Sequence, residues 1–285
     1  MIREKLQTYI RLIKWPQTAL LLLTGLTGYL SSGIQLDSFE PLLHLMGSLF
    51  LTISGSTILN MVYDRDIDSL MQRTMKRPLP AGCISAREAL LAGITLSLVG
   101  QTWAFSVSAL FGGVVFCGFF IDVIIYTVWL KRRTPWSIVW GGISGGMPIL
   151  AGRVLGTGLI DLAGIILSLS VLLWIPAHIM TFNLKFSKDY MRAKIPTFPT
   201  NYGFRVTRYT ITFSSIGVAV AIGAGFSALG LDQSILFLML ALSAGLISLA
   251  VTSLVKPSDR MNLLLFKLAS LYMLSAMILI IAGVL

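Results

Sequence analysis

Charged residues, cysteine and histidine are all scarce in this chain of 285 residues. Only 12% of its residues are charged, whereas 55% are hydrophobic, and the mean hydropathy is +0.84. A soluble globular domain has about a quarter of its residues charged. The composition therefore excludes that class and predicts an integral membrane protein.

The two cysteines offer little material for a redox or zinc centre. Cys83 lies in a polar segment, Cys117 lies inside an apolar run, and the sequence has no CxxC pair. Neither a disulfide framework nor a zinc site is expected. The net charge of +10 first indicates the positive-inside rule in a membrane protein. We therefore expect the lipid bilayer as a partner and no nucleic acid.

Apolar stretches long enough to cross a bilayer recur along the whole chain. A bilayer core about 30 Å thick needs about 20 apolar residues in a helix. We predict an all-α integral membrane protein with nine transmembrane helices in one domain over residues 1–285. The predicted spans are 17–34, 41–63, 86–104, 108–130, 136–156, 159–182, 208–229, 233–255 and 261–284. The basic N-terminal segment has no signal-peptide cleavage motif, so the first span is expected to be retained.

The positive charges alternate between the two ends of the predicted spans. Of the 22 Lys and Arg residues, 20 lie in the N-terminal segment or in the connections after the second, fourth, sixth and eighth spans. Cytoplasmic connections carry the positive charge, so we place the N-terminus and these connections in the cytoplasm and the C-terminus outside. We expect a prokaryotic cell membrane. The connections after spans two and six, of about 25 residues each, are expected to carry function.

The connection after the second span begins with amide and carboxylate side chains at helical spacing. Asn60, Asp64 and Asp68 are each four residues apart, so on a helix they line one face. Two carboxylates this close repel each other unless a cation lies between them. Mg²⁺ takes one or two protein carboxylates and completes its shell with water and phosphate oxygens. The pattern therefore predicts a Mg²⁺ site that binds a diphosphate.

Two arginines follow this cluster. Arg73 and Arg77 are also four residues apart, and a guanidinium group presents paired donors that suit phosphate oxygens. We expect both to bind the same diphosphate. The alternative is a solvated helix end that only fixes the topology. The joint spacing of one Asn, two Asp, two Arg and a Pro favours the functional interpretation.

This connection resembles the signature of a known family. It is similar to the first signature of the UbiA superfamily of intramembrane prenyltransferases, most closely to its protoheme IX farnesyltransferase branch. The residues that carry the resemblance are Asn60, Asp64, Asp68, Met71, Arg73, Thr74, Arg77, Pro78 and Leu79. It implies nine helices around a central cavity, a prenyl diphosphate bound through Mg²⁺, and cytosolic caps on the loops after helices two and six.

The end of the fourth span is similar to the same branch. The matching segment runs from Tyr126 through Lys131, Arg132 and Arg133 to Trp136. The resemblance implies that Lys131 helps to hold the diphosphate. For Arg132 and Arg133 a role as topology anchors is an equal alternative.

The connection after the sixth span is similar to the second signature, with several departures. Pro176, His178, Asp189, Tyr190 and Pro196 match. The departures are Ala177, Ile179, Met180, Lys188 and Lys194. The resemblance implies that Asp189 is a Mg²⁺ ligand, and we expect Lys188 to contact phosphate as a point charge.

Several side chains are expected to line the cavity. His178 either ligates heme iron or orients the acceptor, or it is a hydrogen-bonded structural histidine. Aromatic faces are expected to shield an allylic carbocation, and the candidates are Tyr126, Trp129, Phe182 and Tyr190.

Charges inside the spans are costly and suggest function. Asp122 lies within the fourth span. Arg153 lies near the outer end of the fifth span, where the resembling branch usually has Trp. We expect Arg153 either to snorkel to the outer interface or to contact a substrate in the cavity.

The resemblance implies an enzyme that transfers the farnesyl group of farnesyl diphosphate to heme B, giving heme O and diphosphate with the addition of water. The catalytic residues so implied are Asp64, Asp68, Lys131 and Asp189. The departures near His178 and at Arg153 leave a quinone-ring or lipid-alcohol acceptor as an alternative. A nine-helix transporter or a non-catalytic lipid or heme carrier would explain the hydropathy but not the Asp and Arg spacing.

Overall fold

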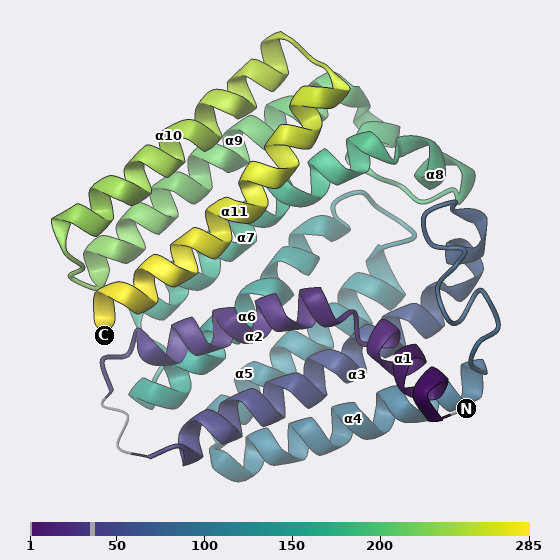
Figure 1. Cartoon of the computed structure of the whole chain (residues 1–285), viewed down its shortest axis with the longest axis horizontal. Coiled ribbons are helices and arrows are strands. Elements are labelled where there is room, and N and C mark those ends of the chain that lie inside the picture. Colours follow the sequence, from purple (N-terminus) through teal and green to yellow (C-terminus); the bar gives the residue numbers. More distant parts are fainter. Residues whose placement is uncertain (1, 35–37) are drawn as a thin grey trace.

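The computed structural model describes residues 2–34 and 38–285, and the side chains of these residues except 2–6. The charges of Arg3 and Lys5, which the topology prediction counted, therefore lie outside the described side chains. Within the described ranges the chain folds into helices and no strands, and Figure 1 shows them side by side in one bundle. They are α1 (Ile2–Leu12), α2 (Trp15–Leu30), α3 (Glu40–Leu70), α4 (Ala86–Val107), α5 (Ala109–Phe120), the π-helix η1 (Ile121–Leu130), α6 (Ser137–Thr157), α7 (Leu162–Lys185), α8 (Ser187–Arg192), α9 (Phe198–Ala228), α10 (Gln233–Val255) and α11 (Asp259–Val284).

Eight helical segments in the described ranges are long and apolar enough to cross a membrane. They are α3, α4, α5 continued by η1, α6, α7, α9, α10 and α11. The first predicted span is α2, which has 16 residues and is shorter than the about 20 that a full crossing needs. The architecture is therefore consistent with the predicted nine helices, although the count by length is lower by one.

The break between the third and fourth spans lies at Ser108. The backbone of Ser108 is extended, with φ −159°, and its hydroxyl accepts a hydrogen bond from the amide of Phe111. This N-cap ends α4 and starts α5 without a long loop. The prediction of two separate spans here is confirmed.

Both long connections were predicted too long. We expected the second span to end at residue 63 and the seventh to begin at residue 208, but α3 continues to Leu70 and α9 already begins at Phe198. Hydropathy ends a span where charges begin, whereas a helix continues for as long as its backbone bonds are made. The connection between α7 and α9 also contains the short helix α8. The backbone of α9 is kinked at Gly203, with φ 81°, which only glycine adopts at low cost.

Small residues allow α2 and α6 to pack at close range. A Cβ atom on Gly28 would overlap the carbonyl oxygen of Ile149, and a Cβ atom on Gly152 would overlap that of Gly25. In membranes such glycines let helix backbones approach closely. The contact joins α2 to the centre of the bundle.

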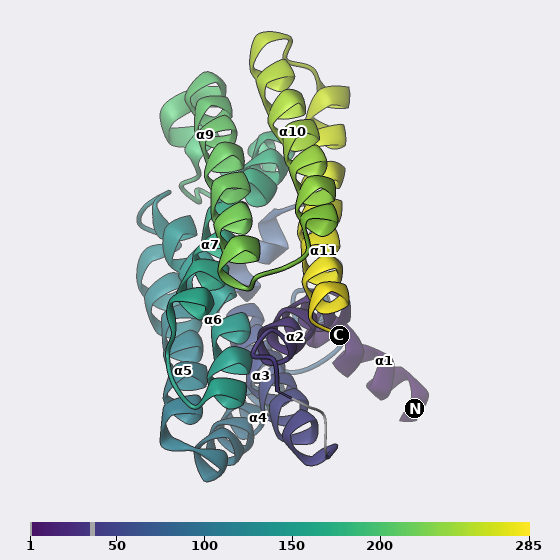
Figure 2. The same ribbon diagram turned by 90° about the vertical axis from the view of Figure 1, so that its left-hand side faces the viewer.

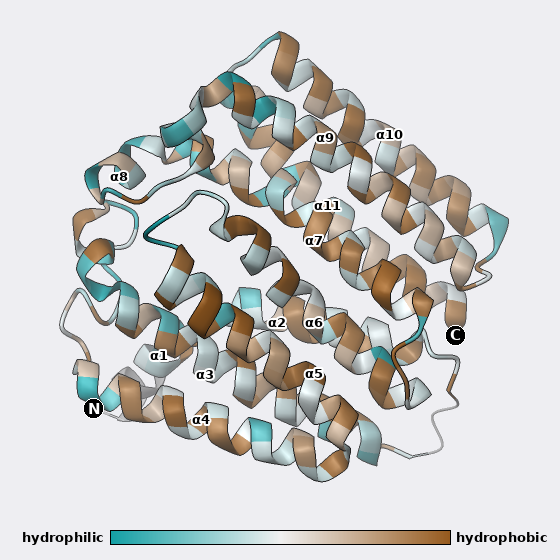
Figure 3. Ribbon diagram, turned by 180° about the vertical axis from the view of Figure 1, so that it is seen from behind, coloured by the Kyte–Doolittle hydropathy of each residue, from teal (hydrophilic) through white to brown (hydrophobic). Residues whose placement is uncertain are grey.

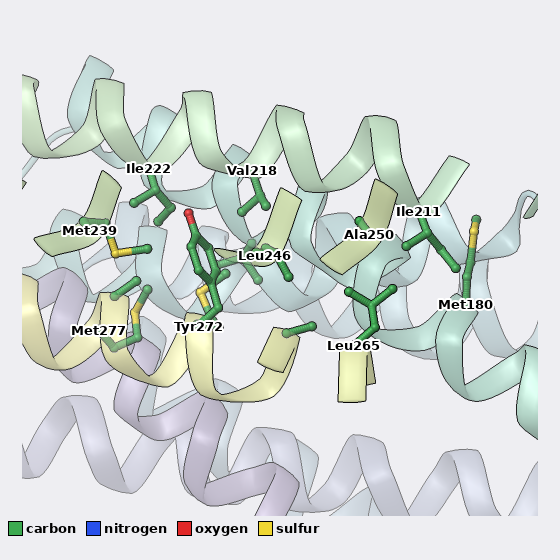
Figure 4. Packing of buried hydrophobic residues seen from close by; sticks show 14 of the residues in the cluster. Met180, Ile211, Val218, Ile222, Met239, Leu246, Ala250, Leu265, Tyr272 and Met277 are labelled. Carbon is green, nitrogen blue, oxygen red and sulfur yellow. The ribbon is translucent and has the colours of Figure 1, made fainter. Parts of the chain in front are cut away.

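The largest hydrophobic core lies among α7, α9, α10 and α11. Figure 4 shows Val218 and Ile222 of α9 opposite Leu246 of α10 and Tyr272 of α11. The hydroxyl group of Tyr272 is hydrogen-bonded to that of Ser243 at 2.9 Å, so this core has its buried polar group satisfied.

The two ends of the bundle differ. The N-terminus, α1 and α8 lie toward one end and the C-terminus lies at the other (Figure 1), which is the arrangement that an odd number of crossings requires. Hydrophobic residues cover the helices along their length, and hydrophilic segments gather around α8 (Figure 3). In the side view, the end of α11 lies beside α2, and α1 projects from the bundle (Figure 2).

We expect Gly152→Ala to destabilise the protein because the added methyl group overlaps the backbone of α2. Overpacking of this kind costs about 1–3 kcal/mol, so the thermal unfolding temperature in detergent micelles should fall. Gly245→Ala is the matched control because nothing lies within 4 Å of a Cβ atom there. An unfolding temperature that stays the same in Gly152→Ala would contradict the close packing of α2 and α6.

Candidate active site

The end of α3 buries two carboxylates. Asp64 and Asp68 each have only 4% of their surface exposed, and they lie on the same face of α3 as the spacing predicted. Asp66, between them, instead pairs with Arg132 at 2.7 Å on a more exposed face. Since a buried unpaired carboxylate is costly, Asp64 and Asp68 need compensating partners.

Each buried carboxylate pairs with one cationic side chain, and the two cations come from different connections. Lys131, which follows η1, forms an ion pair with Asp64. Arg77, from the segment between α3 and α4, pairs with Asp68 at 2.7 Å between Nη1 and Oδ2. Burial lowers the pKa of Lys131, but the phenol of Tyr126 and the carboxylate of Asp64 raise it by more, so the pKa lies above its ordinary value. Lys131 is therefore a permanent cation.

One oxygen in this cluster lacks a partner. Asp64 Oδ1 is buried and makes no hydrogen bond with any described residue. A buried polar atom without a partner is rare in folded proteins, and a carboxylate oxygen of this kind suits a hard cation. In the part of the chain that the structure describes, no three His, Cys, Asp or Glu side chains gather as a metal-binding group. Two carboxylates are nevertheless enough for a Mg²⁺ ion that also binds phosphate oxygens, so the residues fit such an ion.

Asn60 lies in a polar network inside the membrane region. Its amide nitrogen donates to Asp122 at 2.9 Å, and its amide oxygen accepts a hydrogen bond from Thr127 at 2.9 Å. Ser56 also donates to Asp122. The network uses only one of the two lone pairs of the Asn60 oxygen, so the second lone pair is free to bind a metal ion, and the role of Asn60 as a metal ligand stays a prediction.

Asp122 was predicted from the sequence as a costly charge, but its partners were not. Ser56 lies four residues before Asn60, so extending the spacing of four toward the N-terminus would have found it. Asp122 and Thr127 are five residues apart on η1, and a π-helix brings residues at this spacing close together through its i→i+5 bonds. This second part of the network depends on a helix type that the sequence pattern does not reveal.

Arg73 and Arg77 contact different partners. Arg77 contacts Asp68, whereas the guanidinium group of Arg73 lies over the ring of Phe182 at 4.7 Å and donates to the hydroxyl group of Tyr190 at 3.3 Å. The expectation that both bind the same group followed from helical spacing. Residues 71–82 form turns instead, so a separation of four does not place the two side chains together.

Asp189 ties α8 to the end of α3. Its carboxylate is buried and accepts hydrogen bonds from the backbone amides of Gln72 and Arg73, both at 3.4 Å. A hydrophobic cluster of Ile67, Met71, Tyr190, Ala193 and Ile195 supports the same contact. The connection after α3 and the connection after α7, which resemble the two signatures, are therefore in contact. Lys188, next to Asp189, is exposed.

His178 lies between two aromatic rings. It stacks on Trp174 at 4.7 Å and on Phe266 at 4.6 Å between ring centroids, and its Nδ1 pairs with the hydroxyl group of Ser270 at 3.2 Å. Within the described residues its Nε2 has no hydrogen bond. The other histidine, His44, accepts a hydrogen bond from Trp103 at 2.7 Å, which holds it in a structural role near the start of α3.

The remaining aromatic candidates have different surroundings. The ring of Tyr126 lies 5.6 Å from the Lys131 ammonium group, close to the buried carboxylates. Trp129 has 54% of its surface exposed. Since Arg73 covers the faces of Phe182 and Tyr190, a protein cation already uses two of the four rings that were expected to face a carbocation.

Arg153 does not snorkel to the outer interface. It is buried, with 8% of its surface exposed, and forms an ion pair with Asp161 at 2.6 Å. Its Nη1 also donates to the carbonyl oxygen of Ser31 at 2.5 Å. The hydrogen bond from Arg153 holds the pKa of Asp161 below its ordinary value. These contacts lock α2, α6 and α7 together, and they give the predicted cavity role no support.

The sequence of this chain is similar to that of a known protein family. Residues 21–275 match the UbiA prenyltransferase family. A protoheme IX farnesyltransferase from Archaeoglobus fulgidus is 42% identical over 217 residues, which cover 76% of each chain. A protoheme IX farnesyltransferase from Pyrobaculum islandicum is 34% identical over 263 residues, 92% of this chain and 94% of that one.

Solved structures share the fold. A digeranylgeranylglyceryl phosphate synthase superposes with a TM-score of 0.81 at 20% identity, over 99% of both chains. A UbiA homologue from Archaeoglobus fulgidus, bound to GPP and Mg²⁺, superposes with a TM-score of 0.68 at 18% identity, over 96% of this chain and 99% of that one. The family match covers most of the chain and includes the buried carboxylates of α3. The chain therefore belongs to the UbiA prenyltransferase family of membrane enzymes.

Proposed function

We propose that this enzyme is a Mg²⁺-dependent protoheme IX farnesyltransferase, which converts heme B, farnesyl diphosphate and water to heme O and diphosphate. The observation that carries the donor half is the pair of buried carboxylates on α3, one of which has an oxygen without a partner. The acceptor half is supported by relatives of that name at 34–42% identity.

Asn60, Asp64 and Asp68 would hold Mg²⁺ from α3, and Asp189 from α8 would complete the site. The bound ion neutralises the diphosphate and so assists its departure. Lys131 and Arg77 stay available for phosphate oxygens because each uses only part of its donor capacity on a carboxylate. A lysine ammonium has three donors and a guanidinium has five.

Arg73 has a different role in this proposal from the one predicted. Its guanidinium group lies against side chains of α7 and α8, where it places a positive charge and orders Tyr190 and Phe182. Lys188 is an exposed cation beside Asp189 and would attract the anionic donor at longer range. Tyr126 lies beside Lys131 and is the aromatic ring best placed to shield the allylic carbocation from water.

His178 is the side chain best suited to the acceptor. Its ring is held on both faces and its Nδ1 is fixed by Ser270, so the free Nε2 has one defined direction. A neutral imidazole nitrogen of this kind can ligate heme iron. Trp129 and Arg153, which were also predicted to line the cavity, have no such arrangement.

We expect Asp64→Asn to reduce product formation by on the order of 10²-fold, because the substitution removes the charge that binds the ion. The assay follows farnesylated heme by mass spectrometry, with purified protein, Mg²⁺, heme B and farnesyl diphosphate. Asp66→Asn is the matched control, since Asp66 lies on the same helix but pairs with Arg132 away from the buried face.

Parallel incubations with quinone-ring precursors and lipid alcohols test the acceptor. Product from one of these compounds alone would keep the donor chemistry and refute heme B as the acceptor. No product from any acceptor would refute the proposed activity and favour a transporter or carrier.

We expect His178→Ala to weaken heme B binding by about tenfold, or ~1.4 kcal/mol, because the substitution removes the stacked ring and the free nitrogen. The measurement is a titration followed by the heme absorption band, which should also shift in position. His44→Ala is the control, because His44 contacts Glu40 and Trp103 near the start of α3. An unchanged band and affinity in His178→Ala would show that His178 does not bind heme.

We expect Asp122→Leu to raise the Mg²⁺ concentration needed for half-maximal activity by about tenfold, because loss of a group that orients a metal ligand costs on the order of 10–100-fold in metal affinity. Asp122→Asn should retain most of the affinity, since its amide oxygen can accept the bonds from Ser56 and Asn60. Titration of activity with Mg²⁺ checks both. If the Leu and Asn variants respond alike, Asp122 does not act by positioning Asn60.

A further inference from the structure

Lys14 has an unusual backbone conformation. It lies between α1 and α2 with φ 47° and ψ 57°, in the left-handed region, and Lys194 is the one other non-glycine residue with positive φ in the described chain. Its carbonyl oxygen accepts hydrogen bonds from the amides of Gln17 at 2.9 Å and Thr18 at 3.2 Å, which start α2. Glycine would adopt this conformation at lower cost. A lysine at this position therefore needs a reason that lies in its side chain.

The junction that carries Lys14 is held against the site. Leu12 is fully buried, and it packs in one cluster with Ile58 and Met61 of α3 and with Leu79. These neighbours lie on the helix that bears Asp64 and on the segment that bears Arg77. The rigid turn at Lys14 therefore has a fixed position relative to the buried carboxylates.

The ammonium group of Lys14 is close enough to the buried charges at the end of α3 to interact with them. It interacts electrostatically with Arg77, Lys131, Asp64 and Asp68. Asp64 is already paired with Lys131 and Asp68 with Arg77, and Lys14 has no hydrogen bond or ion pair with any residue whose side chain is described. Desolvation, then the positive charges of Arg77 and Lys131, lower the pKa of Lys14 to about 8. It is thus mostly protonated at neutral pH, with all three donors unused.

The charges of the cluster do not cancel. Lys14, Arg77 and Lys131 outnumber Asp64 and Asp68 by one positive charge. A prenyl diphosphate carries about three negative charges and Mg²⁺ two positive charges, so the pair brings about one negative charge in total. The excess of positive charge among these five groups favours an anionic ligand in this low-dielectric region.

We propose that Lys14 is a further diphosphate-binding residue, which contacts the prenyl donor from the α1–α2 junction alongside Lys131 and Arg77. This inference rests on the proposed donor chemistry. The negative charge on the diphosphate increases as its bond to the prenyl carbon breaks, so a cation fixed in advance by the backbone stabilises the departing group.

The test measures binding of farnesyl diphosphate with Mg²⁺ by calorimetry in detergent micelles. Lys14→Met keeps the length of the side chain and removes its charge, and we expect the dissociation constant to rise about tenfold. Lys14→Arg keeps the charge and should stay within about threefold of the wild type. The matched control is Lys194→Met, the other lysine with positive φ, which is exposed and should leave the dissociation constant unchanged.

A further variant separates binding from folding. Lys14→Gly relieves the strained backbone, so its thermal unfolding temperature should not fall, while its affinity should be as low as that of Lys14→Met. Wild-type affinity in Lys14→Met, or an equal loss in Lys194→Met, would overturn the inference and leave the proposed function intact. If the wild type itself does not bind farnesyl diphosphate, the proposed donor chemistry fails and the role of Lys14 fails with it.

Discussion

The burial of two carboxylates at the end of α3 is the constraint on which the site depends. Asp64 and Asp68 lie four residues apart with 4% of each exposed, so their mutual repulsion and lost hydration must both be compensated. The compensating cations, Lys131 and Arg77, come from two different connections. Those connections are held by these ion pairs and also by packing, since Leu79 of the first connection lies in a buried cluster with Ile58 and Met61. At this end of the bundle charge pairing is added to packing, whereas the core among α7, α9, α10 and α11 is held mainly by packing.

The position of these carboxylates is reinforced from within the membrane region. Asn60 continues their helical face and is held by Asp122 and Thr127 of η1. A π-helix has poorer backbone geometry than an α-helix and occurs mostly at functional sites. Here the π-helix brings the carboxylate of Asp122 and the hydroxyl group of Thr127 to the side-chain amide of Asn60. The hydrogen bonds between η1 and the side chains of Ser56 and Asn60 offset the cost of the irregular helix. They also orient this face of α3 along more than one turn.

The sequence predicted the helices and the shared face of Asp64 and Asp68 well and the connections poorly, for physical reasons. Spans follow from the length of apolar runs, and Asp64 and Asp68 share a face because an α-helix has a fixed period. The same rule does not place Arg73 beside Arg77, because they lie in turns, which have no such period. The partners of Arg153 and Asp189 are set by contacts between distant segments. The backbone of Lys14 is left-handed because of its tertiary surroundings, and no local pattern shows this.

The two ends of the bundle differ in how their buried charges are compensated. At the end of the bundle where the C-terminus lies, Arg153 is bound by Asp161 and by Ser31. Its charge and most of its donors are therefore satisfied within the protein. At the other end, the cluster leaves Asp64 Oδ1 without a partner, and the ammonium group of Lys14 has no hydrogen bond or ion pair with any residue whose side chain is described. Selection for stability alone favours closed networks, because unsatisfied buried groups are costly. The open network therefore distinguishes a binding site from a structural clamp: its missing partners are an anion and a cation, which is the composition of a diphosphate with its metal ion.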